Sequence, residues 1–195
     1  MKKLFAMAIA MVVAFSANAQ IQKNEKIISV GVGLRNNIYS ASSYESVLAP
    51  INADFEVGVV EGLFGVDKLS LGVGGTIGYT QAKQDYSKYL PGSNIGYKFS
   101  YVNVGAKGYF HYDLNVENLD VYAAITLGYD MASAKAYGDW KSDMDIPSDM
   151  DIPFVGDFSV GVSVGARYWF QDNLAANMEI GVGLSFLKLG VSYNF

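Results

Sequence analysis

The chain contains no cysteine in its 195 residues. A disulfide framework, a thiolate metal site and a lipid-modified cysteine are therefore excluded, and we do not expect a lipoprotein. Basic residues are also few: Lys and Arg number 14 against 19 Asp and Glu, which gives a formal net charge of −5 at pH 7. This balance argues against nucleic acid as a partner, because nucleic-acid-binding surfaces are rich in Lys and Arg.

Long hydrophobic runs are scarce as well. Two lysines at positions 2 and 3 precede an apolar run over residues 4–15, and Ala17-Asn18-Ala19 follows as a small-x-small cleavage site. We interpret residues 1–19 as a cleaved secretory signal peptide and residues 20–195 as the mature domain. Loss of the two lysines takes the net charge from −5 to −7. The export signal points to the periplasm, the outer membrane or the exterior. No later run reaches the roughly 18 apolar residues of a membrane-spanning helix, so helical membrane spans are not expected.

The last nine residues show what the chain has instead. In residues 187–195 every odd position is apolar and every even position is polar or glycine. A period of two places the two kinds of side chain on opposite faces of a β-strand. The strand ends on Phe195, and a terminal aromatic suits an outer-membrane strand that leaves the bilayer at that point.

The same alternation predicts eight strands, each near the ~9–11 residues that a tilted strand needs to cross a bilayer. They are expected at 26–35, 50–60, 69–80, 99–111, 120–132, 157–170, 174–184 and 187–195. In every strand, either the odd or the even positions, which form one face, hold only apolar, aromatic or glycine residues, for example Val104, Val164 and Leu184. We call such a set of alternate positions one parity of the strand. This uniform face is either the core of a soluble lipocalin-like barrel or the lipid-facing wall of a membrane barrel.

The opposite parity decides between the two. It is mostly small, as in Gly72, Gly74, Thr76 and Gly78, where a water-facing surface would be dense in Lys and Glu. Small residues suit the cramped lumen of an eight-stranded barrel. Closure also removes strand edges, whose unpaired amides are costly in lipid. The sequence therefore predicts an all-β fold, an eight-stranded antiparallel up-and-down transmembrane β-barrel with its apolar face outward.

The C-terminal residues also carry a family resemblance. Lys188, Gly190, Tyr193 and Phe195 match the signal by which the barrel-assembly machinery recognises outer-membrane β-barrels, and Gly190, Tyr193 and Phe195 are its expected assembly-signal residues. The mature chain resembles the small outer-membrane barrels of the OmpX or OmpA-transmembrane type. The resemblance implies a multi-pass protein among outer-membrane lipid and lipopolysaccharide, with a surface role and no enzymatic residues. It implies no peptidoglycan-tethering domain after Phe195.

Connection lengths predict the orientation. The links at 61–68, 113–118 and 171–173 are short and fit periplasmic turns. Longer links at 36–49, 83–98 and 133–156 fit extracellular loops, whereas the fourth, near Ser185 and Phe186, is nearly absent. An even number of strands returns both termini to the periplasm.

Charged residues on the lumen parity are the main candidate site. They are Asp54, Glu56, Lys107, Arg167, Glu179 and Lys188. A charge alone in a narrow interior is costly, so we expect a salt-bridge network that plugs the lumen. Arg167 and Glu179 flank the turn at 171–173 and could meet diagonally across adjacent strands. The alternative is a selectivity filter in a narrow pore.

No catalytic constellation or cofactor site is indicated. The single histidine, His111, faces the lumen without a Ser or carboxylate partner implied by spacing, which favours packing over catalysis. Gly31-Val32-Gly33 is not followed by a helix, which rules out a nucleotide-binding loop. We therefore expect no catalytic residue, no metal and no cofactor.

A tandem repeat stands out in the longest predicted loop. Residues 142–147 and 148–153 both read Ser-Asp-Met-Asp-Ile-Pro. Its aspartates offer oxygen ligands for calcium, but the central glycine and terminal glutamate of a calcium loop are missing. We interpret it as a duplication in a tolerant surface loop.

Three functions remain open from the sequence. The favoured one is a structural, adhesive or surface-interaction role. Loop tyrosines such as Tyr39, Tyr86 and Tyr137 could then contact an extracellular ligand, or they could equally form the upper aromatic belt of the barrel. The second is a narrow pore for small solutes or small apolar molecules. The third is a barrel-embedded lipid-modifying enzyme.

Overall fold

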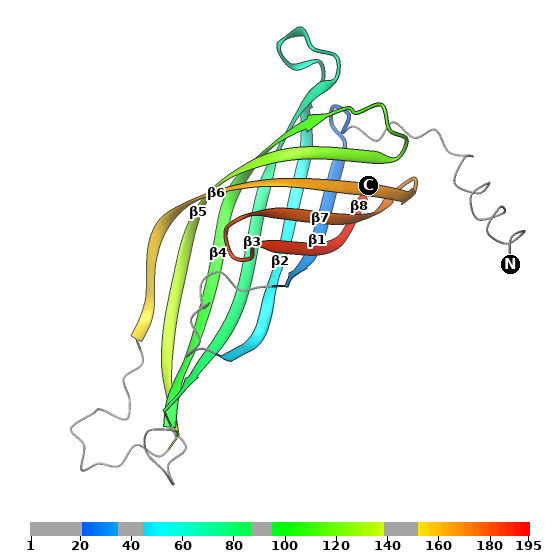
Figure 1. Cartoon of the computed structure of the whole chain (residues 1–195). Helices are drawn as coiled ribbons and strands as arrows, with labels where there is room; N and C mark the ends of the chain where they lie inside the picture. The colour runs from blue at the N-terminus through cyan, green and yellow to red at the C-terminus, as the bar shows by residue number, and fades with distance from the viewer. Residues whose placement is uncertain (1–20, 35–44, 87–94, 139–151) are drawn as a thin grey trace, which may run out of the picture.

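The protein forms one closed barrel. The computed structural model describes residues 21–34, 45–86, 95–138 and 152–195. Within them, eight strands pair with their chain neighbours, every pair is antiparallel, and β8 closes on β1 (Figure 1). The strands are β1 Lys26–Gly33, β2 Glu45–Val60, β3 Leu69–Asp85, β4 Ile95–Tyr112, β5 Leu119–Gly138, β6 Ile152–Gln171, β7 Leu174–Val182 and β8 Leu187–Asn194. The predicted eight-stranded antiparallel barrel is confirmed.

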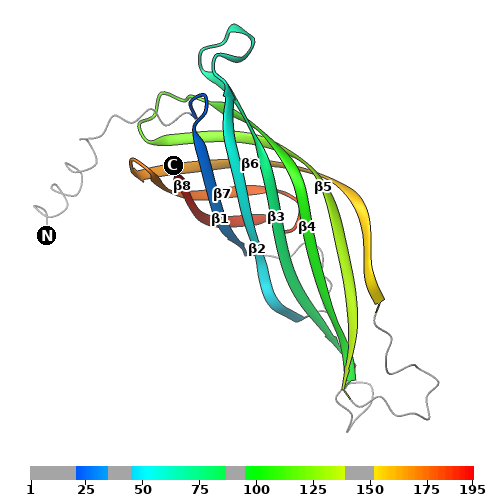
Figure 2. The same cartoon turned by 180° about the vertical axis from the view of Figure 1, so that it is seen from behind.

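The wall of the barrel is much taller on one side than on the other. β1, β7 and β8 end close to their predicted bounds, whereas β2 to β6 extend well beyond them (Figures 1 and 2). The prediction was wrong here because it ended each strand where the apolar alternation ends. Pairing itself depends on backbone amides and carbonyls, and the ladder continues through polar pairs such as Lys83 opposite Lys98. The links predicted at 36–49, 83–98 and 133–156 are correspondingly shorter.

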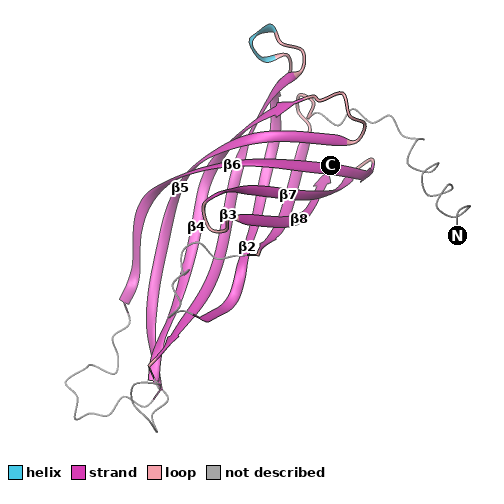
Figure 3. Cartoon of the chain, in the orientation of Figure 1, coloured by secondary structure: helices cyan, strands magenta, loops and turns pink. Residues whose placement is uncertain are grey.

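Three short connections lie at one end of the barrel together with the start of β1 and the end of β8 (Figure 1). The β2–β3 connection contains a feature that the sequence did not predict, the 3₁₀ turn η1 Leu63–Gly65, which Figure 3 shows in cyan. Phe64 adopts a left-handed conformation there, with φ of 57°. None of the helical segments in the described part of the chain is long and apolar enough to cross a membrane.

The apolar parity faces outward along all eight strands. Val30, Val104 and Val164 are among the many exposed apolar side chains, and Asp54, Lys107 and Arg167 are among the buried polar ones. Soluble monomers do not expose a continuous apolar surface of this extent, whereas a lipid-facing wall requires one. The predicted orientation of the faces is confirmed with one exception. Leu184 is buried, because β7 already ends at Val182 and the turn directs this side chain inward.

Aromatic side chains mark both ends of the apolar surface. Tyr129 and Phe158 pack edge to face toward the tall end of the wall, with ring centroids 5.4 Å apart. Tyr168, Phe170 and Phe195 are exposed at the end that carries the short turns. We call the surface between these two rows the apolar belt. Rows of aromatics at the two edges of an apolar band are characteristic of transmembrane barrels.

Glycines on the inner face allow close approach of neighbouring strands. A Cβ on Gly74 would lie 2.9 Å from the Cα of Glu56 and still closer to the carbonyl oxygen of Phe55, so the conflict is with backbone. Gly108 lies on the outer face, where an added Cβ would have no atom within 4 Å. The two positions form a matched pair on adjacent strands.

We expect Gly74→Ala to lower the free energy of unfolding by about 1–3 kcal/mol or more, since the backbone of β2 must shift to admit the methyl group. Gly108→Ala should stay within about 0.5 kcal/mol of the wild type. Urea unfolding of the protein refolded into lipid vesicles measures both. Equal effects of the two substitutions would contradict the inward and outward placement of these glycines.

Candidate functional site

We take the end of the barrel with the short turns as its bottom, although Figure 1 draws that end uppermost. The lower half of the lumen then contains a ring of four charged side chains, which we call the lower cluster. It consists of Glu56 from β2, His111 from β4, Asp120 from β5 and Arg167 from β6. Each of these residues is at most 2% exposed. Carboxylates and cations alternate around the ring, so each charge has a partner on both sides.

The distances in the lower cluster are those of direct hydrogen bonds. The Nε2 atom of His111 lies 2.6 Å from Oε1 of Glu56, and its Nδ1 atom lies 2.8 Å from Oδ1 of Asp120. The guanidinium of Arg167 donates to Oε2 of Glu56 at 2.5 Å and to Oδ2 of Asp120 at 3.2 Å. Both ring nitrogens of His111 thus face carboxylate acceptors, which is the arrangement of an imidazolium.

Two tyrosines hold the guanidinium in place. The Arg167 guanidinium carbon lies 4.6 Å from the ring centroid of Tyr122 and 5.6 Å from that of Tyr109. The two rings meet edge to face with centroids 5.6 Å apart. A desolvated cation over aromatic faces gains cation–π attraction in addition to its ion pairs. These contacts restrict the side chain to one position in the lumen.

A second group of charges lies above the first, and we call it the upper cluster. It consists of Asp54, Lys107, Glu179 and Lys188. Lys107 Nζ is 2.8 Å from Glu179, and Lys188 Nζ is 2.9 Å from Asp54 and 3.1 Å from Glu179. The Tyr122 hydroxyl donates to Glu179 at 3.0 Å and so connects the two clusters.

An apolar cluster closes the end of the lumen below the charges. Ile21, Ile27, Trp169 and Ala175 form it, and all four are buried. Backbone hydrogen bonds of 2.9 Å from Asn24 to Gly58 and from Gly58 to Glu25 hold the segment before β1 against β2. Three successive layers, one apolar and two ionic, therefore fill the lumen on the side of the short turns.

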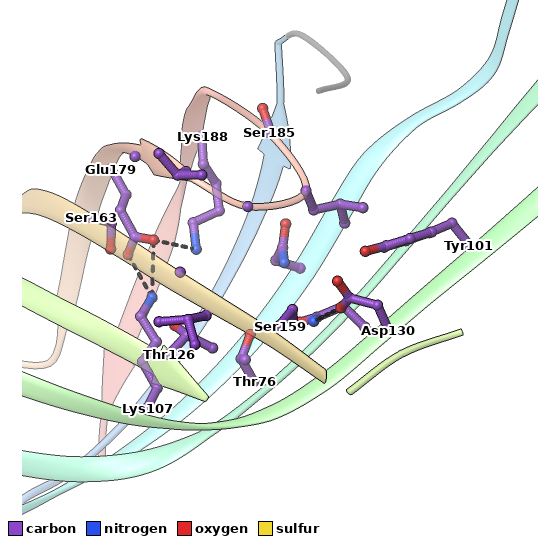
Figure 4. A pocket seen from close by; sticks show the side chains of 18 residues that line it. Thr76, Tyr101, Lys107, Thr126, Asp130, Ser159, Ser163, Glu179, Ser185 and Lys188 are labelled. Atoms are coloured by element: carbon purple, nitrogen blue, oxygen red, sulfur yellow. Dashed lines mark hydrogen bonds and ion pairs between the residues drawn. The ribbon is translucent and has the colours of Figure 1, made fainter. Parts of the chain in front are cut away.

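The other half of the lumen is a cavity of about 500 Å³ above the upper cluster (Figure 4). Lys107, Glu179 and Lys188 meet at one end of it, where the dashed lines in Figure 4 mark their ion pairs. Most of the remaining side chains that line it are hydroxyls and amides. They include Asn52, Thr76, Asn103, Thr126, Ser159, Ser163 and Ser185. The cavity thus combines a neutralised ionic floor and hydroxyl and amide side chains with an apolar part of its lining, formed by Val160, Val182 and Leu184.

The six predicted lumen charges all lie on the inner face, and each takes part in one of the two clusters. The expected pairing of Arg167 with Glu179 is wrong. Arg167 contacts Glu56 and Asp120, whereas Glu179 lies directly opposite Lys188 in the β7–β8 ladder and pairs with the two lysines.

Sequence reasoning missed two members of the lower cluster. His111 was expected to lack a carboxylate partner, but Glu56 and Asp120 occupy both of its ring nitrogens. Asp120 has the lumen parity of its strand, directly after the short turn that joins β4 and β5. That parity was the signal that could have identified it.

The predicted assembly-signal residues lie together on β8. Gly190 faces inward, where a Cβ would come within 2.7 Å of the Cα of Gly31. Tyr193 and Phe195 are exposed on the outer surface, and the Phe195 ring lies 6.5 Å from that of Phe55. Recognition by an assembly machinery stays a prediction.

Two other sequence features lie outside the described residues. They are the expected signal peptide at 1–19 and the tandem repeat, of which only Ile152 and Pro153 fall within β6. Among the residues that the structure describes, no group of three or more His, Cys, Asp or Glu is arranged to hold a metal ion.

Comparison with known proteins places the fold. No protein-family model matches the sequence, and no curated protein has significant sequence similarity to it. Ail, the attachment invasion locus protein of Yersinia pestis, solved with the heparin analogue sucrose octasulfate, aligns with a TM-score of 0.52 at 17% identity, over 89% of this chain and 100% of that chain. OprG of Pseudomonas aeruginosa aligns with a TM-score of 0.48 at 10% identity, over 91% of this chain and 98% of that chain. Neisserial surface protein A aligns with a TM-score of 0.45 at 14% identity, over 89% of this chain and 98% of that chain.

The closed barrel and its outward apolar belt define the fold of the small outer-membrane β-barrel proteins. Within that class the architecture is of the OmpX and OmpA-transmembrane type, a single eight-stranded barrel. The family resemblance read from the C-terminal residues is confirmed at the level of fold.

Proposed function

We propose that this protein is a non-conducting barrel of the outer membrane that acts through its extracellular side. The short turns and both ends of the described barrel would face the periplasm, and the tall wall of β2 to β6 would rise from the cell surface. Short periplasmic turns and long extracellular extensions are the usual arrangement in outer-membrane barrels. The wall and the cavity that opens beside it are then the parts available to partners.

The three filled layers of the lumen are the observation that supports a barrel that does not conduct. Side chains of the lower cluster are almost completely buried and paired with one another, although the Nε atom of Arg167 has no hydrogen-bond partner among the described residues, so we expect no hydrated path between them. An ion moving through the lumen would have to separate these pairs, and breaking a buried pair costs about 3–5 kcal/mol. The barrel is therefore better suited to a structural or adhesive role than to transport.

The same geometry argues against catalysis at His111. A general base must reach the proton that it abstracts from a substrate or from a nucleophile. Both nitrogens of His111 are engaged by carboxylates, and the side chain is 0% exposed. We propose no enzymatic role.

The ligand in the Ail structure is a sulfated polyanion. Recognition of such a ligand requires clustered Lys and Arg. Residues 139–151 of this chain, in the longest predicted loop, contain five Asp and one Lys. We therefore propose contact through hydroxyl, amide and aromatic groups, and not recognition of a polyanion.

Single-channel recording in planar bilayers tests the closed lumen. We expect the wild type to give no conductance steps. The double variant Glu56→Ala/Arg167→Ala removes one acid and one base of the lower cluster at constant net charge, and it should convert the silent barrel into a leaky one. The double variant Glu45→Ala/Lys83→Ala removes an exposed ion pair of 3.0 Å on the tall wall and should stay silent. Steps from the wild type as frequent as those from the lumen variant would show that the proposal is wrong.

A further inference from the structure

The lumen cavity reaches the outer surface of the barrel through its side. Val160 on β6 and Val182 on β7 both line the cavity, although they are outward-facing and 69% and 67% exposed. Inward-facing residues such as Thr126 and Ser163 line the same cavity. We infer from this lining by residues of both faces that the cavity opens through the wall.

The opening in the barrel wall arises because the neighbouring strands β6 and β7 differ in length. β6 pairs with β7 only as far as Val162 opposite Val182, and β7 then ends. On its other side β6 stays paired with β5 up to Ile152 opposite Ala134. Among the described residues, the stretch of β6 from 152 to 161 thus has a ladder partner on one side only, and the short β7–β8 turn follows directly where the β6–β7 ladder ends (Figure 1). We call this opening the side portal.

The portal lies at the upper edge of the apolar belt. Phe158, which is 86% exposed and packs on Tyr129, is on one side of it, and the exposed Phe186 is on the other. Aromatic rows of this kind mark the level of the lipid headgroups. The rim itself is apolar, since it is formed by Val160, Val182 and the inward-turned Leu184. The portal therefore connects the cavity with the outer leaflet as well as with water.

Inside the portal the chemistry is polar and balanced. Lys107 and Lys188 are each paired with Glu179, and Asn103 donates a hydrogen bond to Asp130. Asn103 and Ser185 are thus already hydrogen-bonded within the protein, and we expect Thr76, Thr126, Ser159 and Ser163 to bind a guest. Paired charges with surrounding hydroxyls favour a head group that is rich in hydrogen bonds and carries no net charge.

We propose that the side portal admits an amphiphile with an uncharged, hydroxyl-rich head group, of which a glycosyl head is the simplest case. The head occupies the cavity, and the chain passes between Val160 and Val182 into the bilayer. A cavity of about 500 Å³ falls within the range of small-molecule sites, roughly 300–1,000 Å³. This inference rests on the proposed function only in placing the barrel in a membrane, and it does not depend on whether the lumen conducts.

Titration of the barrel in phosphatidylcholine nanodiscs with decyl maltoside, followed by amide chemical shifts, tests the proposal. We expect saturable shifts at Thr126, Ser159 and Ser163 and none that saturate at the lipid-facing Val164. Val160→Trp narrows the portal and should raise the half-saturating concentration at least tenfold. Val164→Trp, on the same face and strand, is the matched control and should change it less than twofold.

Two comparison ligands separate the alternatives. Maltose has the head without the chain and should bind at least tenfold more weakly than decyl maltoside. Decyl phosphate has the chain with an anionic head and should also bind more weakly. Shifts that grow linearly without saturation, equal binding of maltose, or tighter binding of decyl phosphate would each overturn the proposal. Conductance of the wild type would overturn the closed lumen and leave these titrations unaffected, so the two failures are distinguishable.

Discussion

Arg167→Met should lower the free energy of unfolding by about 3–5 kcal/mol, one of the two largest effects that we expect of a single substitution. The guanidinium is the common partner of Glu56 and Asp120, and it lies against the rings of Tyr109 and Tyr122. Methionine replaces its volume but none of its five donors. Two buried carboxylates are then left to share one imidazole, in a site without access to water.

A thermodynamic cycle separates the ionic contribution from packing. Adding Glu56→Gln to Arg167→Met removes the uncompensated negative charge and leaves the His111–Asp120 pair of 2.8 Å intact. We therefore expect the double variant to be more stable than the Arg167→Met single variant, which additive effects would not give. Urea unfolding in lipid vesicles provides the values. A loss of less than about 1 kcal/mol for Arg167→Met would mean that the lower cluster does not stabilise the barrel, since this is the size expected of a solvent-exposed pair.

The fold could be predicted from the sequence because a membrane barrel records its two environments in alternate residues. Lipid selects valine and leucine on one parity, and the narrow lumen selects glycine and serine on the other, so the number, position and orientation of the strands follow from a period of two. The outer ends of β2 to β6 show no such alternation of apolar and small residues. Beyond the bilayer neither face meets lipid, and the strands continue only because their backbones remain paired.

The site was predictable in part for the same reason. Parity places Asp54, Glu56 and Arg167 in the lumen, but it does not say which charges meet there. Glu56 and Arg167 come from strands on different sides of the barrel, and their contact depends on strand tilt and on the reach of long side chains across the lumen. The side portal was not predictable, because it depends on where the β6–β7 ladder ends, at Val162 opposite Val182, and the apolar pattern of β6 continues beyond that point to Phe158.

Val164→Arg is the second substitution with a large expected effect. Val164 lies in the middle of the apolar belt on β6, six residues from Phe158 and six from Phe170. Arginine near the bilayer midplane of a transmembrane barrel costs about 2–4 kcal/mol, because its charge must be hydrated or drawn to an interface. We expect a loss of that size in vesicles of phosphatidylcholine.

Val155→Arg is the control at an equally exposed valine of the same strand that does not face lipid. Val155 is 64% exposed, against 61% for Val164, but its side chain has the inward parity of Asp157 and Ser159, and it lies beyond Phe158 and outside the belt. The cost there should fall to about 0–1 kcal/mol, since the charge reaches water directly. If both sites faced water, their equal exposure would predict equal and small effects. A difference of 2 kcal/mol or so between two equally exposed valines is therefore the direct signature of lipid on the outer face, whereas equal losses would contradict a transmembrane barrel.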